Sequence, residues 1–181
     1  MAKPKLVVIS GPAGTGKTTL AHELASAIGC PAISRDEIKE GMVHAADHFE
    51  PGWGDPLTQK TFPLFFDVLR LLLEAGVTVV AEAAFQHVNW APNLEPLAAV
   101  AELRIVQCHV EGEVARERVA GRLRTAHADA QLLADLEAGT PYYADFERVS
   151  IDAQSMDVDT TSGYEPSIEE IVAFVNGSPA P

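Results

Sequence analysis

Apolar residues occur along this chain in two patterns: short continuous runs, and longer stretches in which they recur every three or four residues. The short runs are typical of buried strands and the longer stretches of amphipathic helices. The pattern predicts strands at 6–10, 31–34, 77–81 and 103–110, and a fifth at either 149–151 or 156–160.

Helices fill the stretches between these runs. The predicted helices cover residues 17–28, 35–48, 57–75, a polar segment before residue 100, 113–124, 129–139 and 167–174. Pro63 predicts a kink or a later start in the third of them. Ser34 with Glu37, and Ser167 with Glu170, have the spacing of capping boxes.

The alternation of strands and helices predicts an α/β fold, in which helices cover both faces of a parallel sheet. A chain of 181 residues suits one domain. We expect this domain to span residues 1–176, followed by a frayed tail at 177–181.

A glycine-rich turn follows the first predicted strand and matches the phosphate-binding pattern GxxxxGK[ST]. Its candidate nucleotide-binding residues are Gly11, Pro12, Ala13, Gly14, Thr15, Gly16, Lys17, Thr18 and Thr19. Free N–H groups at the following helix start favour an anion there. Lys17 would reach the outer phosphates of ATP, and the Thr18 hydroxyl would bind Mg²⁺, which prefers oxygen ligands.

The net charge of −13 and the pI near 4.7 indicate a surface that repels nucleic acid and anionic membranes. No apolar run is long enough to span a bilayer, and no secretory leader is evident. Cys30 and Cys108 lie in apolar surroundings, which fits buried thiols in the cytoplasm. We therefore expect a cytoplasmic protein without nucleic-acid or membrane partners.

The residues that follow each strand are candidates for chemistry, because ligands of such folds bind at the carboxyl ends of the strands. Asp36 follows the second strand and could deprotonate an acceptor hydroxyl, or hold Mg²⁺ through water. Arg35 could neutralise an anionic acceptor or the moving phosphoryl group. A carboxylate in a first helical turn is also favourable without any function.

Glu82 ends the third strand, where many nucleotide-binding proteins carry a magnesium-holding aspartate. It could hold Mg²⁺ through water, bind the acceptor or form a structural salt bridge. Lys39, Trp53 and Phe85 are further candidates for the acceptor pocket, although such aromatic residues often belong to the core.

Four of the thirteen Lys and Arg residues fall between Arg116 and Arg124. Arg118 and Arg122 are four positions apart, on one face of a predicted helix. Phosphoryl transfer requires cations around the transferring oxygens and the exclusion of water. We therefore predict an arginine-bearing lid at about 113–139, although a solvated helix with internal ion pairs is the alternative.

The P-loop, the Arg35–Asp36 pair and the arginine-rich helix together resemble the small P-loop kinases. This group includes the kinase domain of bacteriophage polynucleotide kinase, zeta-toxin-like kinases, chloramphenicol phosphotransferase, gluconate kinase and shikimate kinase. The resemblance implies a sheet order of 2-3-1-4-5 and a base at Asp36. It also implies phosphate or base contacts from Arg118 and Arg122, and an adenine-bordering loop at about 160–164.

The sequence is thus interpreted as an ATP- and Mg²⁺-dependent phosphotransferase that acts on a hydroxyl of a small molecule. Lys17, Asp36, Arg118 and Arg122 are the candidate catalytic residues. A nucleoside or nucleotide kinase is one alternative. A non-kinase regulatory ATPase is another, although a guanine-reading motif is absent, since no lysine follows Lys60. The sequence does not identify the acceptor or the oligomeric state.

Overall fold

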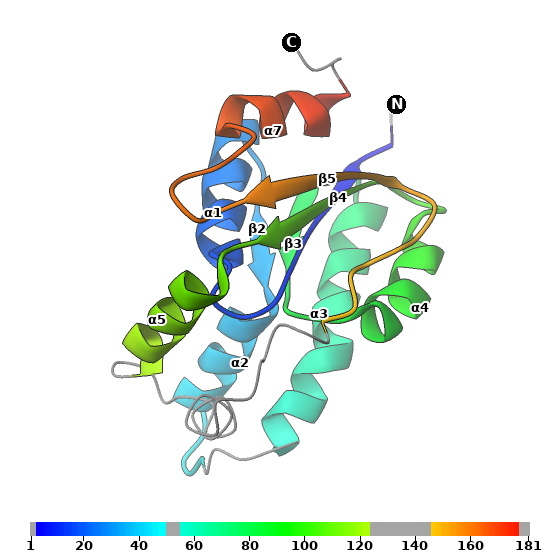
Figure 1. Ribbon diagram of the computed structural model, residues 1–181. Coiled ribbons are helices and arrows are strands. Elements are labelled where there is room, and N and C mark those ends of the chain that lie inside the picture. The colour runs from blue at the N-terminus through cyan, green and yellow to red at the C-terminus, as the bar shows by residue number, and fades with distance from the viewer. Residues whose placement is uncertain (1–2, 50–54, 124–145, 178–181) are drawn as a thin grey trace.

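Five parallel strands form one sheet in the computed structural model, which describes residues 3–49, 55–123 and 146–177 (Figure 1). The strands are β1 (Lys5–Ser10), β2 (Ala32–Ser34), β3 (Val79–Glu82), β4 (Glu102–His109) and β5 (Gln154–Asp159). Their order is β2-β3-β1-β4-β5, and every neighbouring pair is parallel. The expected order 2-3-1-4-5 is confirmed.

The helices follow the strands as the apolar periodicity predicts. They are α1 (Lys17–Ile28), α2 (Arg35–His44), α3 (Pro56–Glu74), α4 (His87–Leu97), α5 (Gly112–Leu123) and α7 (Ile168–Asn176). Of the two candidates for the fifth strand, residues 154–159 form β5 and residues 149–151 do not form a strand. The helix predicted at 129–139 and the tail at 178–181 lie outside the described residues.

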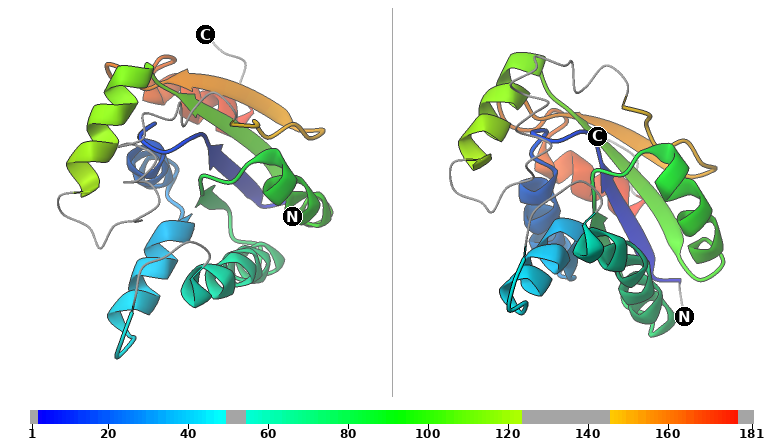
Figure 2. Two further views of the ribbon diagram at one scale, coloured as in Figure 1. Left: turned by 60° about the horizontal axis from the view of Figure 1, so that its bottom comes forward. Right: turned by 90° about the horizontal axis from the view of Figure 1, so that it is seen from below.

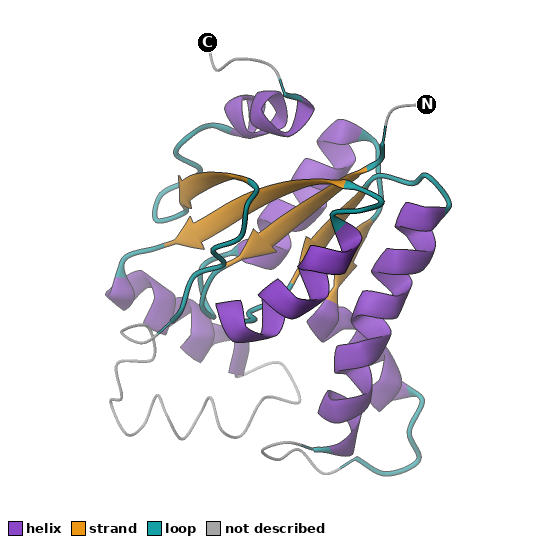
Figure 3. Ribbon diagram, turned by 90° about the vertical axis from the view of Figure 1, so that its right-hand side faces the viewer, coloured by secondary structure: helices purple, strands orange, loops and turns teal. Residues whose placement is uncertain are grey.

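Helices cover the sheet on both faces (Figures 2 and 3). On one face, the buried side chains of α1 and α7 pack on alternate residues of the strands, such as Val7 and Ile9 of β1. On the other face, α3 and α4 pack on the residues between them, such as Leu6 and Val8. Because both faces are buried there, the central strands β1 and β3 are mainly apolar, whereas the edge strand β5 carries polar and largely exposed residues.

The long helix α3 begins where Asp55 caps it, since the Asp55 carboxylate accepts a hydrogen bond from the Thr58 backbone N–H at 2.9 Å. Pro63 lies inside α3, which starts well before it at Pro56, so the later start is excluded. None of the helices within the described ranges is long and apolar enough to cross a membrane.

The two predicted capping boxes have different outcomes. Ser167 and Glu170 form the box at the start of α7, with both reciprocal hydrogen bonds present. The box predicted at Ser34 and Glu37 is wrong, because the Ser34 hydroxyl makes no capping bond. That hydroxyl donates to Glu82 instead, and Glu37 pairs with His22 at 2.7 Å.

Candidate active site

The P-loop turns sharply between β1 and α1 because its glycines adopt conformations that other residues disfavour. Gly14 has a φ of +79°, and a Cβ there would lie 2.6 Å from the Ala115 carbonyl oxygen of α5. Gly11 has a φ of +146°, and a Cβ there would collide with the Cys108 carbonyl at the end of β4. The loop is therefore packed closely against the two elements beside it.

Lys17, the first residue of α1, folds its side chain back over the loop. Its Nζ donates to the Pro12 carbonyl oxygen at 3.0 Å and lies 3.9 Å from Glu82 Oε1. The Lys17 side chain is only 7% exposed. The ammonium group is thus held at the end of the P-loop, where the outer phosphates of a bound nucleotide would lie.

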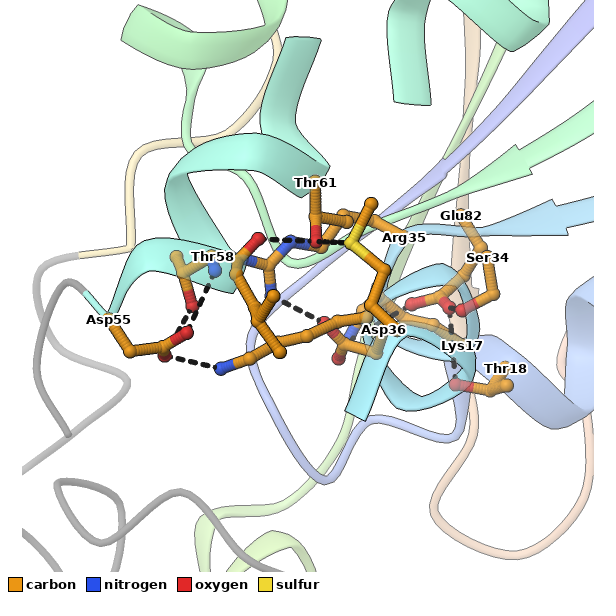
Figure 4. A network of polar contacts seen from close by, with 12 residues as sticks. Lys17, Thr18, Ser34, Arg35, Asp36, Asp55, Thr58, Thr61 and Glu82 are labelled. Atoms are coloured by element: carbon orange, nitrogen blue, oxygen red, sulfur yellow. Dashed lines mark hydrogen bonds and ion pairs between the residues drawn. The ribbon is translucent and has the colours of Figure 1, made fainter. Parts of the chain in front are cut away.

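Glu82 joins three elements at the carboxyl edge of the sheet (Figure 4). Its Oε2 accepts hydrogen bonds from Ser34 Oγ at 2.7 Å and from Thr18 Oγ1 at 3.2 Å. Burial raises the pKa of Glu82 and the nearby Asp36 carboxylate adds to the rise, while Lys17 and the two hydroxyls act in the opposite direction. The net pKa is raised.

Thr18 and Glu82 together supply the kind of oxygen ligands that Mg²⁺ prefers. A hydroxyl and a carboxylate from different elements are already within 3.2 Å of one another. No group of three or more His, Cys, Asp or Glu side chains that could hold a metal occurs in the described part of the chain. This donor set therefore fits an ion that keeps several waters and binds phosphate oxygens, as Mg²⁺ does at such sites.

Arg118 of α5 ties the P-loop to the loop after β5. Its Nη2 donates to the carbonyl oxygens of Thr160 at 2.7 Å and Thr161 at 3.2 Å. Its Nη1 donates to Thr160 Oγ1 at 3.3 Å and to the Gly14 carbonyl oxygen at 3.4 Å. Arg118 thus lies at the P-loop and is positioned by three main-chain oxygens and one hydroxyl, and its predicted contact with the nucleotide remains a prediction.

A cavity of about 550 Å³ lies between these elements. It is lined by Gly14, Gly16, Thr19, Arg118, Gly121, Thr160, Gly163 and Tyr164. Burial, reinforced by Glu23, raises the pKa of the Tyr164 phenol to about 12, so Tyr164 is neutral at pH 7. The P-loop and the loop at 160–164 therefore border one cavity, whose size suits a nucleoside.

Asp36 and Arg35 begin α2 directly after β2, as predicted. Arg35 Nη1 pairs with Asp36 Oδ1 at 2.8 Å, and the Asp36 side chain is 69% exposed. Arg35 Nε is buried and has no hydrogen-bond partner among the described residues. In Figure 4 the pair lies between the Glu82 cluster and Asp55. The carboxylate is thus accessible and lies beside a guanidinium donor.

Lys39 and Asp55 join α2 to the start of α3. Lys39 Nζ lies 2.7 Å from Asp55 Oδ2, which also accepts a hydrogen bond from Thr58 Oγ1 at 2.7 Å. Burial of Asp55 favours its neutral form, but the hydrogen bonds from Lys39 and Thr58 prevail and lower the pKa to about 2. Lys39, a predicted acceptor contact, therefore also has a structural partner.

Phe85 lies in an aromatic cluster between α3 and α4. Its ring centroid is 5.1–5.9 Å from those of Phe62, Phe65, Phe66 and Trp90. Trp90 is fully buried, whereas Phe85 is only partly buried. Trp53 lies outside the described residues. Arg122 belongs to α5, but its side chain is not described, so its predicted contact remains a prediction.

Three polar residues have contacts that the sequence did not predict: Ser34 was expected only as a helix cap, Thr160 only as part of the loop at about 160–164, and Asp55 in no role. Ser34 and Glu82 end neighbouring strands, and paired ends of this kind could have indicated their contact. Thr160 Oγ1 donates to the Thr15 carbonyl oxygen at 2.7 Å, across 145 positions of sequence. No local pattern indicates such a bond, because it depends on the packing of β5 beside β4.

The chain also matches a known protein family in sequence. A family model described as an AAA domain matches residues 6–140, which is more than half of the chain. The chain belongs to this AAA domain family. No protein with a curated function matches the chain in sequence.

Solved structures of several kinases have the same fold as this chain. A candidate kinase of Chloroflexus aurantiacus superposes with a TM-score of 0.83 at 23% identity, covering 98% of this chain and 100% of that one. A sugar kinase of Janibacter gives 0.66 at 20%, covering 98% and 97%. The APS kinase of Mycobacterium tuberculosis, in complex with AMPPNP and APS, gives 0.68 at 14%, covering 97% and 99%. This AAA domain protein therefore has the fold of the small P-loop kinases.

Proposed function

We propose that this protein is an ATP-dependent phosphotransferase that transfers the γ-phosphoryl group to a hydroxyl of a small molecule. The observation that carries the proposal is the convergence of Lys17, Thr18 and Glu82 at the end of the P-loop. This convergence supports a site for the terminal phosphate of a nucleotide. The accessible Asp36 carboxylate follows β2, the strand next to the one that carries Glu82, and it supports an acceptor site there.

In this proposal each residue acts on one part of the reaction. Lys17 moves from the Pro12 carbonyl to the transferring phosphoryl oxygens and stabilises their charge. Asp36 accepts the proton of the acceptor hydroxyl as the new O–P bond forms and ADP leaves. Arg118 positions the P-loop and the loop after β5. Arg122 is proposed to contact the transferring phosphoryl group.

Thr18 and Glu82 would hold Mg²⁺, Glu82 through water, and the ion would supply neutralising charge to the phosphate oxygens. The Thr18 hydroxyl oxygen would be a ligand of the ion, and Ser34 would hold the Glu82 carboxylate in place through its hydrogen bond.

We also propose that the protein works in the cytoplasm. Cys30 and Cys108 are both free, and burial raises the pKa of the Cys108 thiol to about 12, so it stays protonated.

Two alternatives are weaker. A nucleoside or nucleotide kinase would be expected to stack its acceptor base on an aromatic ring, but Phe85 packs against four other rings. A regulatory ATPase would not require an accessible carboxylate beside the phosphate site. The Arg35–Asp36 pair therefore favours transfer to an acceptor.

The test is ADP release from ATP and Mg²⁺ across a panel of sugars, polyols, antibiotics, nucleosides and nucleotides. We expect one class of acceptor to stimulate ADP release, and Asp36→Asn to abolish the stimulation while ATP still binds. Slow ADP release that no acceptor changes, and that the variant retains, would refute the proposal.

A further inference from the structure

The loop after β5 contacts the P-loop through Thr160, a residue that is only 3% exposed. Thr160 Oγ1 lies 2.7 Å from the Thr15 carbonyl oxygen and 3.2 Å from the His109 carbonyl oxygen. A hydroxyl has one proton to donate, and the shorter contact assigns it to Thr15. The His109 carbonyl already accepts a hydrogen bond from the Thr160 N–H at 3.0 Å. The Thr160 hydroxyl thus holds one carbonyl of the P-loop.

This bond determines how the next peptide group of the P-loop is turned. In a trans peptide, the C=O and the N–H of the following residue point in opposite directions. Because the Thr15 C=O points to Thr160, the Gly16 N–H points away from Thr160. This N–H donates to no acceptor in the described part of the chain. It is therefore available to an anion.

A second carbonyl of the loop is held in the same way. Arg118 Nη1 donates to the Gly14 carbonyl oxygen at 3.4 Å, so the Thr15 N–H is turned away from Arg118. Gly14 and Gly16 have φ of +79° and +73°, and such left-handed residues allow successive N–H groups to form an anion-binding concavity. Two side chains outside the P-loop thus hold the carbonyls that orient its N–H groups.

The Thr15 carbonyl depends on Thr160 for its hydrogen bond. Thr15 is fully buried, and its carbonyl oxygen accepts no other hydrogen bond from the described residues. The Thr15 hydroxyl is engaged elsewhere, since it donates to the Pro12 carbonyl oxygen at 2.8 Å. A buried carbonyl without a donor is unfavourable. Loss of the Thr160 hydroxyl should therefore release the Thr15–Gly16 peptide to turn toward another donor.

We propose that Thr160 is a positioning residue of the phosphate site. Its hydroxyl holds the Thr15 carbonyl, so that the Gly16 N–H is presented to a phosphate oxygen of the nucleotide. The link to turnover rests on the proposed function, whereas binding of a phosphate chain does not require turnover. Thr160 also lines the nucleotide-side cavity, but in this account it acts through the Thr15–Gly16 peptide.

Calorimetry with sodium tripolyphosphate, which has a phosphate chain and no base, tests this role on the full chain. Thr160→Val keeps the side-chain shape and removes the hydroxyl, so it should weaken binding about fivefold to tenfold, the upper range for one lost hydrogen bond. Thr160→Ser keeps the hydroxyl and should bind like the wild type. Thr61→Val is the matched control, because Thr61 is also buried and donates to the Leu57 carbonyl oxygen at 2.6 Å, within α3.

Adenosine separates positioning from other roles, because it has no phosphate. Its affinity, measured by NMR titration, should be the same in Thr160→Val and the wild type. Equal losses for adenosine and tripolyphosphate would assign Thr160 a nucleoside contact or a purely structural role instead. Tripolyphosphate binding of wild-type strength in Thr160→Val, or a Thr160→Ser as weak as the valine variant, would also overturn the inference.

A crystal structure of the wild-type protein with tripolyphosphate keeps the inference testable if Thr160→Val does not fold. We expect the Gly16 nitrogen within about 3.2 Å of a phosphate oxygen, with the Thr15 carbonyl still bonded to Thr160. A Thr15 carbonyl that has turned away from Thr160, or a Gly16 N–H without a phosphate partner, would refute the positioning role.

Kinetics then link Thr160 to transfer. With an acceptor that stimulates ADP release, Thr160→Val should raise the KM for ATP by the factor that it costs in tripolyphosphate affinity, and leave the acceptor KM unchanged. An unchanged KM for ATP would contradict the inference. Weaker tripolyphosphate binding in Thr160→Val, but no acceptor-stimulated turnover in the wild type, would refute the proposed function alone.

Discussion

The P-loop side of this molecule, where we propose that the nucleotide binds, and the α2–α3 side, where we propose that the acceptor binds, are built in different ways. On the P-loop side, main-chain atoms make most of the contacts. Glycines form the loop, and carbonyl oxygens accept hydrogen bonds from Lys17 and Arg118. On the acceptor side, side chains bind one another, as in Arg35 with Asp36 and Lys39 with Asp55. A site built from the backbone depends on glycines that keep the loop conformation, whereas a site built from side-chain pairs depends on the identity of both partners.

In the proposed function this difference has a reason: the phosphate site is common to P-loop proteins, whereas the acceptor site would set specificity. All P-loop proteins have the same phosphate chain to bind, and backbone N–H groups suit it. Acceptors differ in shape and charge, so the residues that meet them must differ as well. Substitutions on the two sides should therefore have distinct kinetic effects, and the following four test that separation.

Lys17→Met should have the largest effect. Removing the cation that meets the transferring phosphoryl group should lower kcat/KM about a thousandfold, as does the loss of one transition-state donor elsewhere. Steady-state ADP release measures the change. Lys60→Met, on the exposed surface of α3, is the matched control and should behave as wild type. Retention of most activity in Lys17→Met would show that the P-loop does not serve transfer.

Asp36→Asn should act on the acceptor side alone. Losing the proposed base should lower kcat about a hundredfold or more, within the usual range of general base catalysis. The affinity for AMPPNP, measured by calorimetry, should not change. Glu37→Gln, the next residue of α2, is the control. A parallel loss of nucleotide affinity in Asp36→Asn would mean that the two sides are not separable.

Arg118→Ala should act on the nucleotide side with a smaller effect. It removes four hydrogen bonds that join α5 and the P-loop to the loop after β5. We expect the KM for ATP to rise about tenfold, which corresponds to about 1.4 kcal/mol, with little change in the acceptor KM. Arg116→Ala, also on α5 but exposed, should leave both values unchanged. An equal effect of the two substitutions would assign Arg118 no special role.

Asp55→Asn should alter stability more than catalysis. Burial alone would raise the pKa of Asp55, but Lys39 and Thr58 lower it from 3.8 to about 2, which corresponds to about 2 kcal/mol of folding stability. This contribution is present above pH 3.8 and is lost as the pH falls toward 2. Urea unfolding at pH 7 should therefore show the loss, and the difference from wild type should shrink between pH 4 and pH 2.

The exposed Asp67→Asn on the same helix is the control for this measurement. If Asp55→Asn were as stable as wild type at pH 7, the junction of α2 and α3 would not depend on the Lys39–Asp55 pair.

The fold and the nucleotide side were predictable because their signals are local. The P-loop is a contiguous motif, and the apolar periodicity indicated β1, α1 and α3 directly. The sheet order came from the resemblance to the small P-loop kinases. The contact of Glu82 with Ser34, 48 positions apart, required the pairing of β2 with β3, and that of Thr160 with Thr15, 145 positions apart, had no signal in the sequence.

The acceptor side was the least predictable for the same physical reason. The residues proposed for it come from the end of β2, from α2 and from the start of α3, and no spacing along the chain relates them. Asp55 illustrates this, because its pairing with Lys39 depends on how α2 and α3 pack after folding.

The most direct test of this account is the fate of the γ-phosphate of ATP, followed by ³¹P NMR with Mg²⁺ and each member of the acceptor panel. The account predicts a new phosphomonoester signal that grows with one class of acceptor, at the expense of ATP, and that is absent with Asp36→Asn. Formation of inorganic phosphate alone, at a rate that no acceptor alters, would contradict it and indicate a regulatory ATPase.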